Sequence, residues 1–354
     1  MRRTVKTKAA SAKPVRVGIV GCGQIAQARH ISSLLKIKGA EIVAICDKNE
    51  DLARRVSERF HISNYYADFS EMLAKEKMDM VDICTAPQTH LALCVSAMEA
   101  GCHVLVEKPM ALSLKEADAM AEAAKANQVE LCVVHNELFE PVMMRARSMV
   151  SKGDIGDLVA VHITDLTPKS YDWVMDKNHW AHKLPGGIFG EMLPHPLYLA
   201  VAFLGHLEPV AVHSRKLGGY DWLAADELRI TLEGKNGIAT IASSINTLED
   251  NVLIDILGTK MGLRVSLWNS VLIKFGIGEN RRVSRGLENL RQGFSILVGT
   301  ALVALNLALG RQHRGHYTLI QGFVKSLQSG SEPPVTIEEA REVVRLYEAI
   351  TDQI

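Results

Sequence analysis

A glycine-rich turn between a strand-like and a helix-like segment constrains the fold of this chain most strongly. The segment VRVGIVGCGQIAQARH places Gly21, Gly23 and Ala26 in a GxGxxA pattern. In such a turn the first glycine permits a tight bend, the second leaves the backbone open to a close approach, and the small third residue lets the helix pack on the strand. The segment therefore predicts the first strand–turn–helix unit of an α/β domain.

The same alternation continues along the first third of the chain. Apolar, β-branched runs occur at 15–20, 41–47, 79–86, 103–108 and 129–134. Helical stretches, such as 50–60 and 113–128, separate them. Strands that alternate with helices in this way are typical of a parallel sheet covered on both faces. We therefore predict an α/β domain over residues 14–138.

A different pattern begins at Phe139. Strands with period-two alternation are expected at 158–165, 227–234, 237–245 and 251–258. This alternation is typical of an antiparallel sheet with one wet face, so residues 139–330 are predicted to form an α+β domain. Thr336 is a probable helix N-cap, and residues 331–354 should close the chain as a docked helix. Residues 1–13 are expected to be a flexible tail.

Composition narrows the class of partner. The chain has 354 residues, with Lys plus Arg equal to Asp plus Glu at 40 each, so no overall field attracts nucleic acid or an anionic membrane. The six cysteines lie in apolar runs without paired CxxC spacing, which favours small buried side chains, predicts no metal site and suits a reducing cytoplasm. The basic N-terminus lacks the apolar core of a secretory signal. A small-molecule substrate is expected.

Residues 294–310, FSILVGTALVALNLALG, form an unusually apolar segment. As a helix it would reach only about 26 Å, short of a hydrocarbon core of roughly 30 Å. We expect it to be buried in the fold or in a subunit interface. A membrane-surface contact and a membrane span are the less favoured alternatives.

The glycine turn, together with an acid at the end of the second strand, predicts a dinucleotide site. The helix that begins at Gln24 and Ile25 directs its N-terminus at the phosphates. Asp47 can accept both ribose hydroxyls of NAD and repel the 2′-phosphate of NADP, although it could also cap the next helix. Lys48 beside it could soften that repulsion, so NAD is favoured and NADP stays possible.

Three further strings carry a family resemblance: TAPQTH at 85–90, GCHVLVEKPM at 101–110 and GGIFGEMLPH at 186–195. With the glycine turn, they make the chain resemble the glucose-fructose oxidoreductase, inositol dehydrogenase and rhizopine-catabolism (Gfo/Idh/MocA) family over about residues 14–260. The last helix also fits. The resemblance implies a Rossmann domain followed by a domain with a mostly antiparallel open sheet, whose face forms the substrate pocket with the nicotinamide.

By this resemblance, Lys108 should reach both cofactor and substrate, and Pro109 should follow a cis peptide. An ammonium group near a hydroxyl that loses its proton stabilises the developing alkoxide. His90 should support the cofactor loop, or be an ordinary residue at a helix start. The further predicted cofactor contacts are Thr85, Ala86, Pro87, Glu107 and Asn136.

The motif of the second domain, GGIFGEMLPH, differs more from the family pattern than the motifs of the first domain do. Glu191 and His195 stand four residues apart, so a helix would direct both into one pocket. His195 is the best candidate for the general base, because the pKa of imidazole lies near working pH, and a structural histidine between two prolines is the alternative. Tyr198 stands where the family carries an aspartate, and we expect it to contact substrate.

Another departure lies at Glu137 and Leu138, where relatives often carry arginines, and it argues against a strongly anionic substrate. His179 and Trp180 could line a sugar pocket, or pack within their loop. The favoured function is an NAD(P)-dependent dehydrogenase acting on a secondary alcohol of a sugar, cyclitol or similar polyol. A redox-neutral lyase or glycosidase that uses NAD transiently is one alternative, and a non-catalytic nucleotide-bound sensor is another. A homo-oligomer, dimer or tetramer, is expected.

Overall fold

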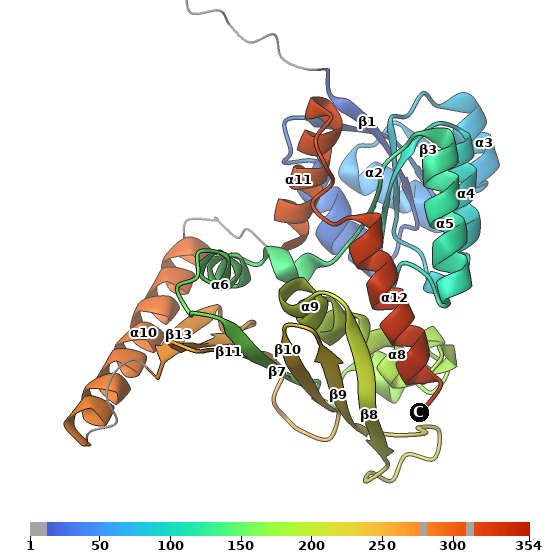
Figure 1. The fold of residues 1–354 in the computed structure, drawn as a ribbon. Helices are drawn as coiled ribbons and strands as arrows, with labels where there is room; N and C mark the ends of the chain where they lie inside the picture. Colours follow the sequence, from blue (N-terminus) through green and yellow to red (C-terminus); the bar gives the residue numbers. More distant parts are fainter. Residues whose placement is uncertain (1–12, 277–281, 309–314) are drawn as a thin grey trace, which may run out of the picture.

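The structure is a computed structural model that describes residues 13–276, 282–308 and 315–354. The predicted tail lies, except for Lys13, outside the described residues. Two sheets, each with its own buried core, form two domains that lie one above the other in Figure 1. This arrangement confirms the predicted α/β domain followed by an α+β domain.

The first sheet is entirely parallel, with the order β3-β2-β1-β4-β5-β6. Its strands are β1 (Val15–Val20), β2 (Ala40–Cys46), β3 (Asn64–Tyr66), β4 (Met80–Ile83), β5 (His103–Val106) and β6 (Leu131–Val133). The order reverses between β1 and β4, and in such sheets ligands bind at the carboxyl ends of the strands beside this switch point. The fold therefore directs the site to the loops that follow β1, β2, β4 and β5.

Helices cover both faces of this sheet. They are η1 (Ala26–Ile31, a π-type helix), α1 (Ser32–Leu34), α2 (Glu50–Phe60), α3 (Phe69–Lys75), η2 (Pro87–Thr89), α4 (His90–Glu99) and α5 (Leu114–Asn127). The predicted bounds of α2 are confirmed, because the side chain of Asn49 caps its first turn and His61 ends it with a left-handed backbone. All six cysteines are unpaired and buried, as predicted.

The second sheet has the order β13-β12-β11-β7-β10-β9-β8, and only the β7–β10 pair is parallel. Its strands are β7 (Leu158–Leu166), β8 (Leu207–Arg215), β9 (Glu227–Gly234), β10 (Gly237–Ser244), β11 (Asn251–Gly258), β12 (Gly262–Ser266) and β13 (Val271–Phe275). The helical elements of this domain are η3 (Asn136–Phe139), α6 (Pro141–Ser151), α7 (Asp172–Met175), η4 (Trp180–Lys183), α8 (Ile188–Met192) and α9 (Pro194–Leu204). The apolar helix α9 packs on one face of the sheet, so the predicted open sheet is confirmed.

The last two helices pack against the first domain, and the second of them also joins it to the second domain. Helix α11 (Gly315–Ser329) buries Leu319 and Phe323 in the core of the first sheet, so it lies with that domain and not with residues 139–330 as predicted. Helix α12 (Ile337–Thr351) begins with the expected cap and a full capping box. It contributes Val344 to the first core and Tyr347 to the second, which fixes one domain against the other.

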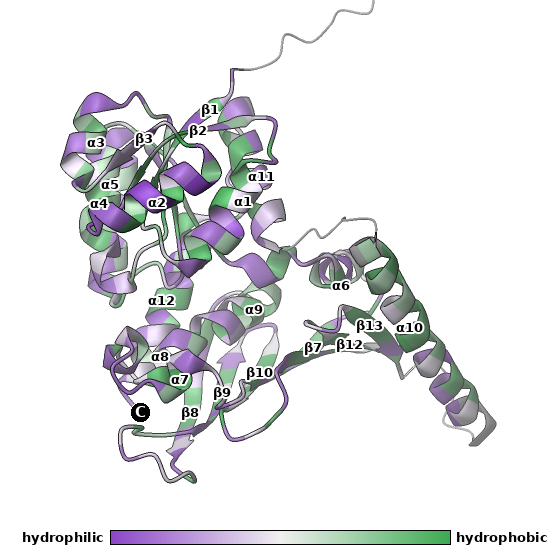
Figure 2. Ribbon diagram, turned by 180° about the vertical axis from the view of Figure 1, so that it is seen from behind, coloured by the Kyte–Doolittle hydropathy of each residue, from purple (hydrophilic) through white to green (hydrophobic). Residues whose placement is uncertain are grey.

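Helix α10 (Arg282–Ala308) differs from our expectation. None of its described side chains is buried, and it extends away from the body of the molecule (Figures 1 and 2). Leu290, Phe294 and Leu297 are 72%, 68% and 70% exposed. The prediction that 294–310 is buried within the fold is therefore wrong for the described part of the segment. No helix in the described part of the chain combines the length and apolar character that crossing a membrane requires.

Candidate active site

The glycine turn after β1 has the geometry that a bound pyrophosphate requires. Gly21 has a φ of +92°, and a Cβ at this position would lie 2.8 Å from the carbonyl oxygen of Cys84. Gly23 faces open space instead, since a Cβ there would meet nothing within 4 Å. Gln24 and Ile25 are exposed at the start of the following helix. A helix N-terminus beside an unobstructed glycine backbone fits the phosphates of a dinucleotide.

Asp47 follows β2 and faces this turn. Its Oδ2 accepts a hydrogen bond from the Cys22 N–H at 2.8 Å, and its Oδ1 accepts one from the Asn49 N–H at 2.9 Å. Each carboxylate oxygen can accept more than one hydrogen bond, so the anchored Asp47 can still receive ribose hydroxyls. Lys48 beside it is exposed.

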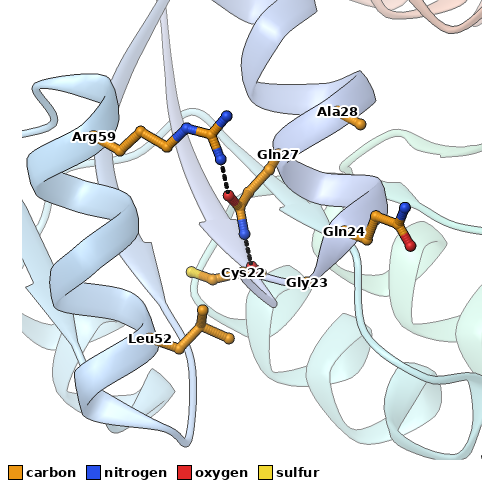
Figure 3. Close-up of a pocket in the computed structure, with 7 residues that line it drawn as sticks. All are labelled: Cys22, Gly23, Gln24, Gln27, Ala28, Leu52 and Arg59. Carbon is orange, nitrogen blue, oxygen red and sulfur yellow. Dashed lines mark hydrogen bonds between the residues drawn. The ribbon is translucent and has the colours of Figure 1, made fainter.

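A cavity of about 440 Å³ lies next to the glycine turn (Figure 3). Gln27 donates to the Cys22 carbonyl oxygen at 2.8 Å and accepts from Arg59 at 2.9 Å. These bonds tie the end of α2 to the glycine turn. They hold the turn in shape before any ligand is bound.

The loop after β4 is tied to the loop after β5 through His90. The fully buried His90 ring approaches the Thr85 carbonyl oxygen at 3.0 Å and the Pro109 carbonyl oxygen at 2.9 Å. Burial lowers the pKa of His90 despite both carbonyl oxygens. Ala86 and Pro87 begin the turn η2 between these two anchors. His90 therefore bridges the two loops, and its role toward a bound cofactor stays a prediction.

Lys108 follows β5 and precedes a cis peptide to Pro109, as predicted. Its ammonium group pairs with the Glu191 carboxylate and also lies 3.3 Å from the Glu191 carbonyl oxygen. The Lys108 side chain is only 12% exposed. Glu191 belongs to α8, so this ion pair joins the first domain to the second. Glu191 and His195 belong to two successive helices, because α8 ends at Met192 and α9 begins at Pro194.

His195 stands in the first turn of α9 and has two partners on one ring nitrogen. Its Nδ1 lies 3.0 Å from Glu137 Oε1 and 2.8 Å from the Tyr198 hydroxyl. The hydroxyl also accepts from the Glu137 N–H at 3.3 Å. A carboxylate at Nδ1 favours the tautomer that carries its proton there, which leaves Nε2 as the basic nitrogen. Glu137, which sequence reasoning noted only as a departure from the family, thus orients His195.

Tyr198 is buried behind this histidine and does not line the cavity described next. Its ring stacks on His135 with centroids 4.5 Å apart. Burial and the charge of His195 lower the pKa of His135 to about 3, so the stacked imidazole is neutral. Tyr198 therefore contacts His195 from behind and is not among the residues that line the cavity, and its predicted contact with substrate stays a prediction.

Lys108, Glu191 and His195 all line one cavity of about 230 Å³. The other residues that line it are Glu137, Asp165, Thr167, Tyr171, Trp173, Met192, Asp250, Val252 and Trp268. Burial, together with the charge of Glu137, raises the pKa of Asp165 to about 7. Asp165 and Asp250 could not be recognised from local sequence, because they reach the cavity from β7 and from the loop before β11.

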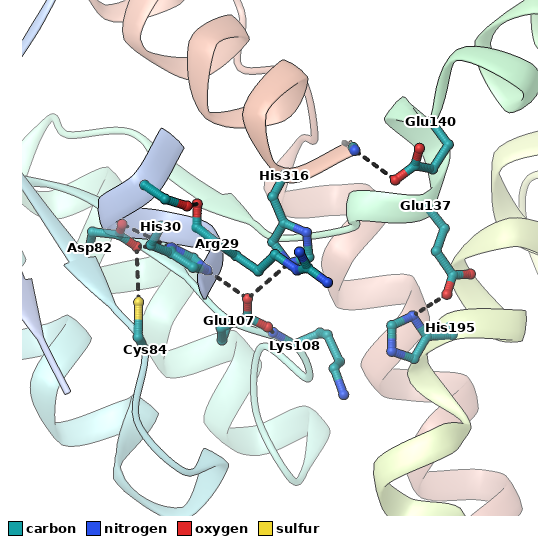
Figure 4. A network of polar contacts seen from close by, with 12 residues as sticks. Arg29, His30, Asp82, Cys84, Glu107, Lys108, Glu137, Glu140, His195 and His316 are labelled. Atoms are coloured by element: carbon teal, nitrogen blue, oxygen red, sulfur yellow. Dashed lines mark hydrogen bonds and ion pairs between the residues drawn. The ribbon is translucent and has the colours of Figure 1, made fainter. Parts of the chain in front are cut away.

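Glu107, predicted as a cofactor contact, instead faces a buried polar network (Figure 4). Its Oε1 accepts from His30 Nε2 at 2.8 Å and lies 3.6 Å from His316 Nε2 on α11, while its Oε2 accepts from the Lys108 N–H at 3.1 Å. His30 Nδ1 lies 2.9 Å from both oxygens of Asp82. The network therefore holds the backbone of Lys108 in place.

Three predicted residues lie away from these contacts. Asn136 is buried at the start of η3. His179 caps η4 by accepting from the Ala181 N–H at 3.3 Å, and Trp180 packs on the core of the second domain. Neither His179 nor Trp180 is among the residues that line the cavity, so loop packing, the alternative reading, describes them better here.

Comparison with known proteins decides the family. The model of an oxidoreductase family with an NAD-binding Rossmann fold (GFO_IDH_MocA) matches residues 15–135, and a GFO/IDH/MocA C-terminal domain model matches residues 143–264. The chain belongs to the Gfo/Idh/MocA oxidoreductase family. It is thus an oxidoreductase whose first domain binds NAD, and the family resemblance predicted from the sequence is confirmed.

Individual relatives are distant. The chain is 24% identical to Oxidoreductase P35 of Formosa agariphila over 72% of this chain and 80% of that protein. It is 30% identical to a myo-inositol 2-dehydrogenase of Thermotoga maritima, over only 54% of this chain and 55% of that protein. The WlbA dehydrogenase from Bordetella pertussis, solved with NADH and UDP-GlcNAcA, superposes with a TM-score of 0.77 at 20% identity, over 97% of this chain and 96% of that chain. That likeness establishes the fold alone.

Proposed function

We propose that this chain is an NAD-dependent dehydrogenase that transfers hydride between a secondary alcohol of a sugar, cyclitol or related polyol and the nicotinamide. The observation that carries the proposal is the pairing of two groups in one cavity. Lys108 is held by Glu191, and His195 is held by Glu137. An ammonium group and an oriented imidazole are the two groups that oxidation of an alcohol requires.

His195 and Lys108 act on different parts of the reacting hydroxyl group. His195 Nε2 accepts the hydroxyl proton as the carbinol C–H bond breaks, and Glu137 stabilises the imidazolium that forms. Lys108 stabilises the negative charge that develops on the same oxygen. The Gly21–Ile25 turn and Asp47 would hold NAD, which would supply the hydride acceptor when bound. The products are the ketone, NADH and a proton that His195 returns to solvent.

The charge of the cavity supports a neutral or cationic substrate. Four carboxyl groups, those of Glu137, Asp165, Glu191 and Asp250, line it together with a single lysine. An added carboxylate or phosphate close to these groups would be repelled in a partly buried space. Trp173 and Trp268 offer aromatic surface to the apolar face of a sugar ring.

Asp47 supports NAD rather than NADP, because a 2′-phosphate would meet the anchored carboxylate. Action in the cytoplasm and assembly into a dimer or tetramer remain predictions from the sequence.

The test is a substrate panel with purified protein and NAD. Neutral polyols, amino sugars and uronic acids are compared by the absorbance of NADH near 340 nm and by product analysis. We expect NADH to form with a neutral or amine-bearing polyol and not with the acids. Product formation without net NADH would favour the redox-neutral lyase or glycosidase, and ligand binding without any product would favour the sensor.

A further inference from the structure

Helix α10 presents its polar side to its own chain. Among the described residues of α10 the half-buried ones are Glu288, Gln292, Ser295, Gly299 and Val303, and the helix contacts β13. Glu288 accepts from the Gly276 N–H at 2.5 Å, and a Cβ at Gly299 would lie 3.2 Å from the Val271 side chain. An ordinary surface helix buries its apolar stripe against the core and exposes its polar side. In α10 this orientation is reversed.

The exposed side of α10 is apolar over most of its circumference. Its most exposed large side chains are Leu287 (55%), Leu290 (72%), Phe294 (68%), Leu297 (70%) and Leu305 (53%). Ile296 and Leu302, on the two flanks, are still 45% and 48% exposed. At about 100° per residue these side chains span an arc of roughly 240°, in which Asn289, Arg291 and Thr300 are also exposed. The upper part of α10 in Figure 2 shows this apolar character.

The width of the arc distinguishes between possible partners. One helix of a second copy would cover a stripe of roughly 100° and leave Ile296 and Leu302 in water. A fluid apolar medium covers the whole arc at once. In the sequence, no charged residue occurs from Gln292 to Gly310. The segment therefore lacks the charged side chains that border the apolar stripe in paired helices.

The charges at the ends of the segment match a negatively charged lipid surface. Arg285 and Arg291 precede the apolar segment, and Arg311 and Arg314 follow it in the sequence. No Asp or Glu occurs between Glu288 and Glu332. Basic residues that flank an apolar segment in the sequence are attracted by anionic headgroups, and a helix that lies in the plane of the membrane need not be long enough to cross the bilayer.

We propose that α10 docks this enzyme on the surface of an anionic phospholipid bilayer, with its exposed apolar arc in the interface and its polar side on β13. The catalytic cavity does not include α10. Membrane docking is therefore independent of the dehydrogenase function, and the failure of either proposal leaves the other standing.

Vesicle sedimentation tests the proposal. The full-length protein is mixed with vesicles of phosphatidylcholine plus phosphatidylglycerol, or of phosphatidylcholine alone. We expect binding to the mixed vesicles that weakens without phosphatidylglycerol and at high salt. The triple variant Leu290→Ser, Phe294→Ser, Leu297→Ser should lower the partition coefficient by about 1000-fold, because each serine removes about tenfold of apolar affinity. Leu217→Ser, at a residue that is 59% exposed elsewhere, is the matched control and should bind like the parent.

A second measurement localises the contact and does not depend on the triple variant. Phe294→Trp places a fluorophore on the exposed side of α10, and brominated lipids in the mixed vesicles should quench its emission beyond that of the parent tryptophans. Parent protein that stays in the supernatant overturns the proposal. So does vesicle binding without this additional quenching. Light scattering that shows an oligomer dissociated by the triple variant, with no vesicle binding, would assign α10 to a subunit interface instead.

Discussion

Removal of the buried His30 side chain should destabilise the protein far more than removal of a similarly bonded surface histidine. His30 joins two buried carboxylates, with Nδ1 2.9 Å from Asp82 and Nε2 2.8 Å from Glu107. Burial alone would lower the pKa of His30, but the charge of Asp82 and its hydrogen bond raise that pKa well above the usual 6.5. The imidazolium thus offsets part of the negative charge of two buried carboxylates.

The magnitude follows from the loss of a buried cation. Removing one partner of a buried ion pair costs about 3–5 kcal/mol, because the other charge stays buried without compensation. His30→Ala should lower the free energy of unfolding by this amount. At roughly 2–4 °C per kcal/mol, the unfolding temperature should fall by about 6–20 °C.

His206 provides a matched control. It also lies between two carboxylates, 2.8 Å from Glu208 and 3.0 Å from Glu342, but its side chain is 64% exposed. Solvent screens such a pair, so His206→Ala should cost at most about 1 kcal/mol. Urea unfolding followed by circular dichroism measures both variants.

The pH dependence gives the prediction a second test. His30 has a raised pKa in the folded state, so its stabilising contribution is complete below pH 6.5 and is lost as the pH rises through the folded pKa. Burial raises the pKa of Glu107, but the bond to His30 outweighs it, and the net pKa lies well below 4.5. The contribution of Glu107 is therefore present above pH 4.5 and is lost as the pH falls further. The cost of His30→Ala should be largest between pH 4.5 and 6.5, and equal losses for the two variants, or a cost that grows with rising pH, would refute this reasoning.

Three further predictions concern the cofactor, the base and the closing helix. Asp47→Ala should weaken NAD binding by about 10- to 100-fold, the equivalent of a lost hydrogen bond to a charged group, and should leave NADP binding no weaker. Fluorescence titration with both reduced cofactors measures this, and an unchanged preference for NADH over NADPH would contradict the prediction. Tyr198→Phe should lower kcat by about tenfold and shift the pH profile of kcat/KM, because His195 loses a partner 2.8 Å from its Nδ1; an unmoved profile would mean that Tyr198 does not position the base. Thr336→Ala removes the capping box shared with Glu339 and should cost about 1 kcal/mol of unfolding free energy, and an unchanged urea midpoint would contradict it.

The parts of the fold that local sequence determines could be predicted. The bounds of α2 follow from a capping asparagine and an amphipathic run, and the capping box of α12 follows from Thr336 and Glu339. The glycine turn and the Glu107-Lys108-Pro109 string lie within a few residues of the strands that they follow. Their spacing is enough to place Asp47 and Lys108 at the carboxyl edge of the first sheet.

The remaining parts of the fold and of the site depend on contacts between segments that lie far apart in the sequence. Glu137 orients His195 from 58 positions away in the chain, and nothing near either residue indicates the contact. Helix α11 lies with the first domain because Leu319 and Phe323 complete that core, although the chain reaches it only after the second sheet. The orientation of α10 is likewise set by β13, so its apolar segment could be recognised in the sequence while the direction it faces could not.

Lys108 provides the most direct test of the account. Lys108→Met keeps the length of the side chain and removes the charge, and Lys115→Met changes an exposed lysine on α5 as the matched control. With the best substrate of the panel, the initial rate of NADH formation should fall by at least about 100-fold in Lys108→Met, as expected when a group that stabilises developing charge is lost, while NADH binding changes little. A Lys108→Met enzyme that keeps the rate of the Lys115→Met control would contradict the proposed role of the ammonium group at the reacting oxygen.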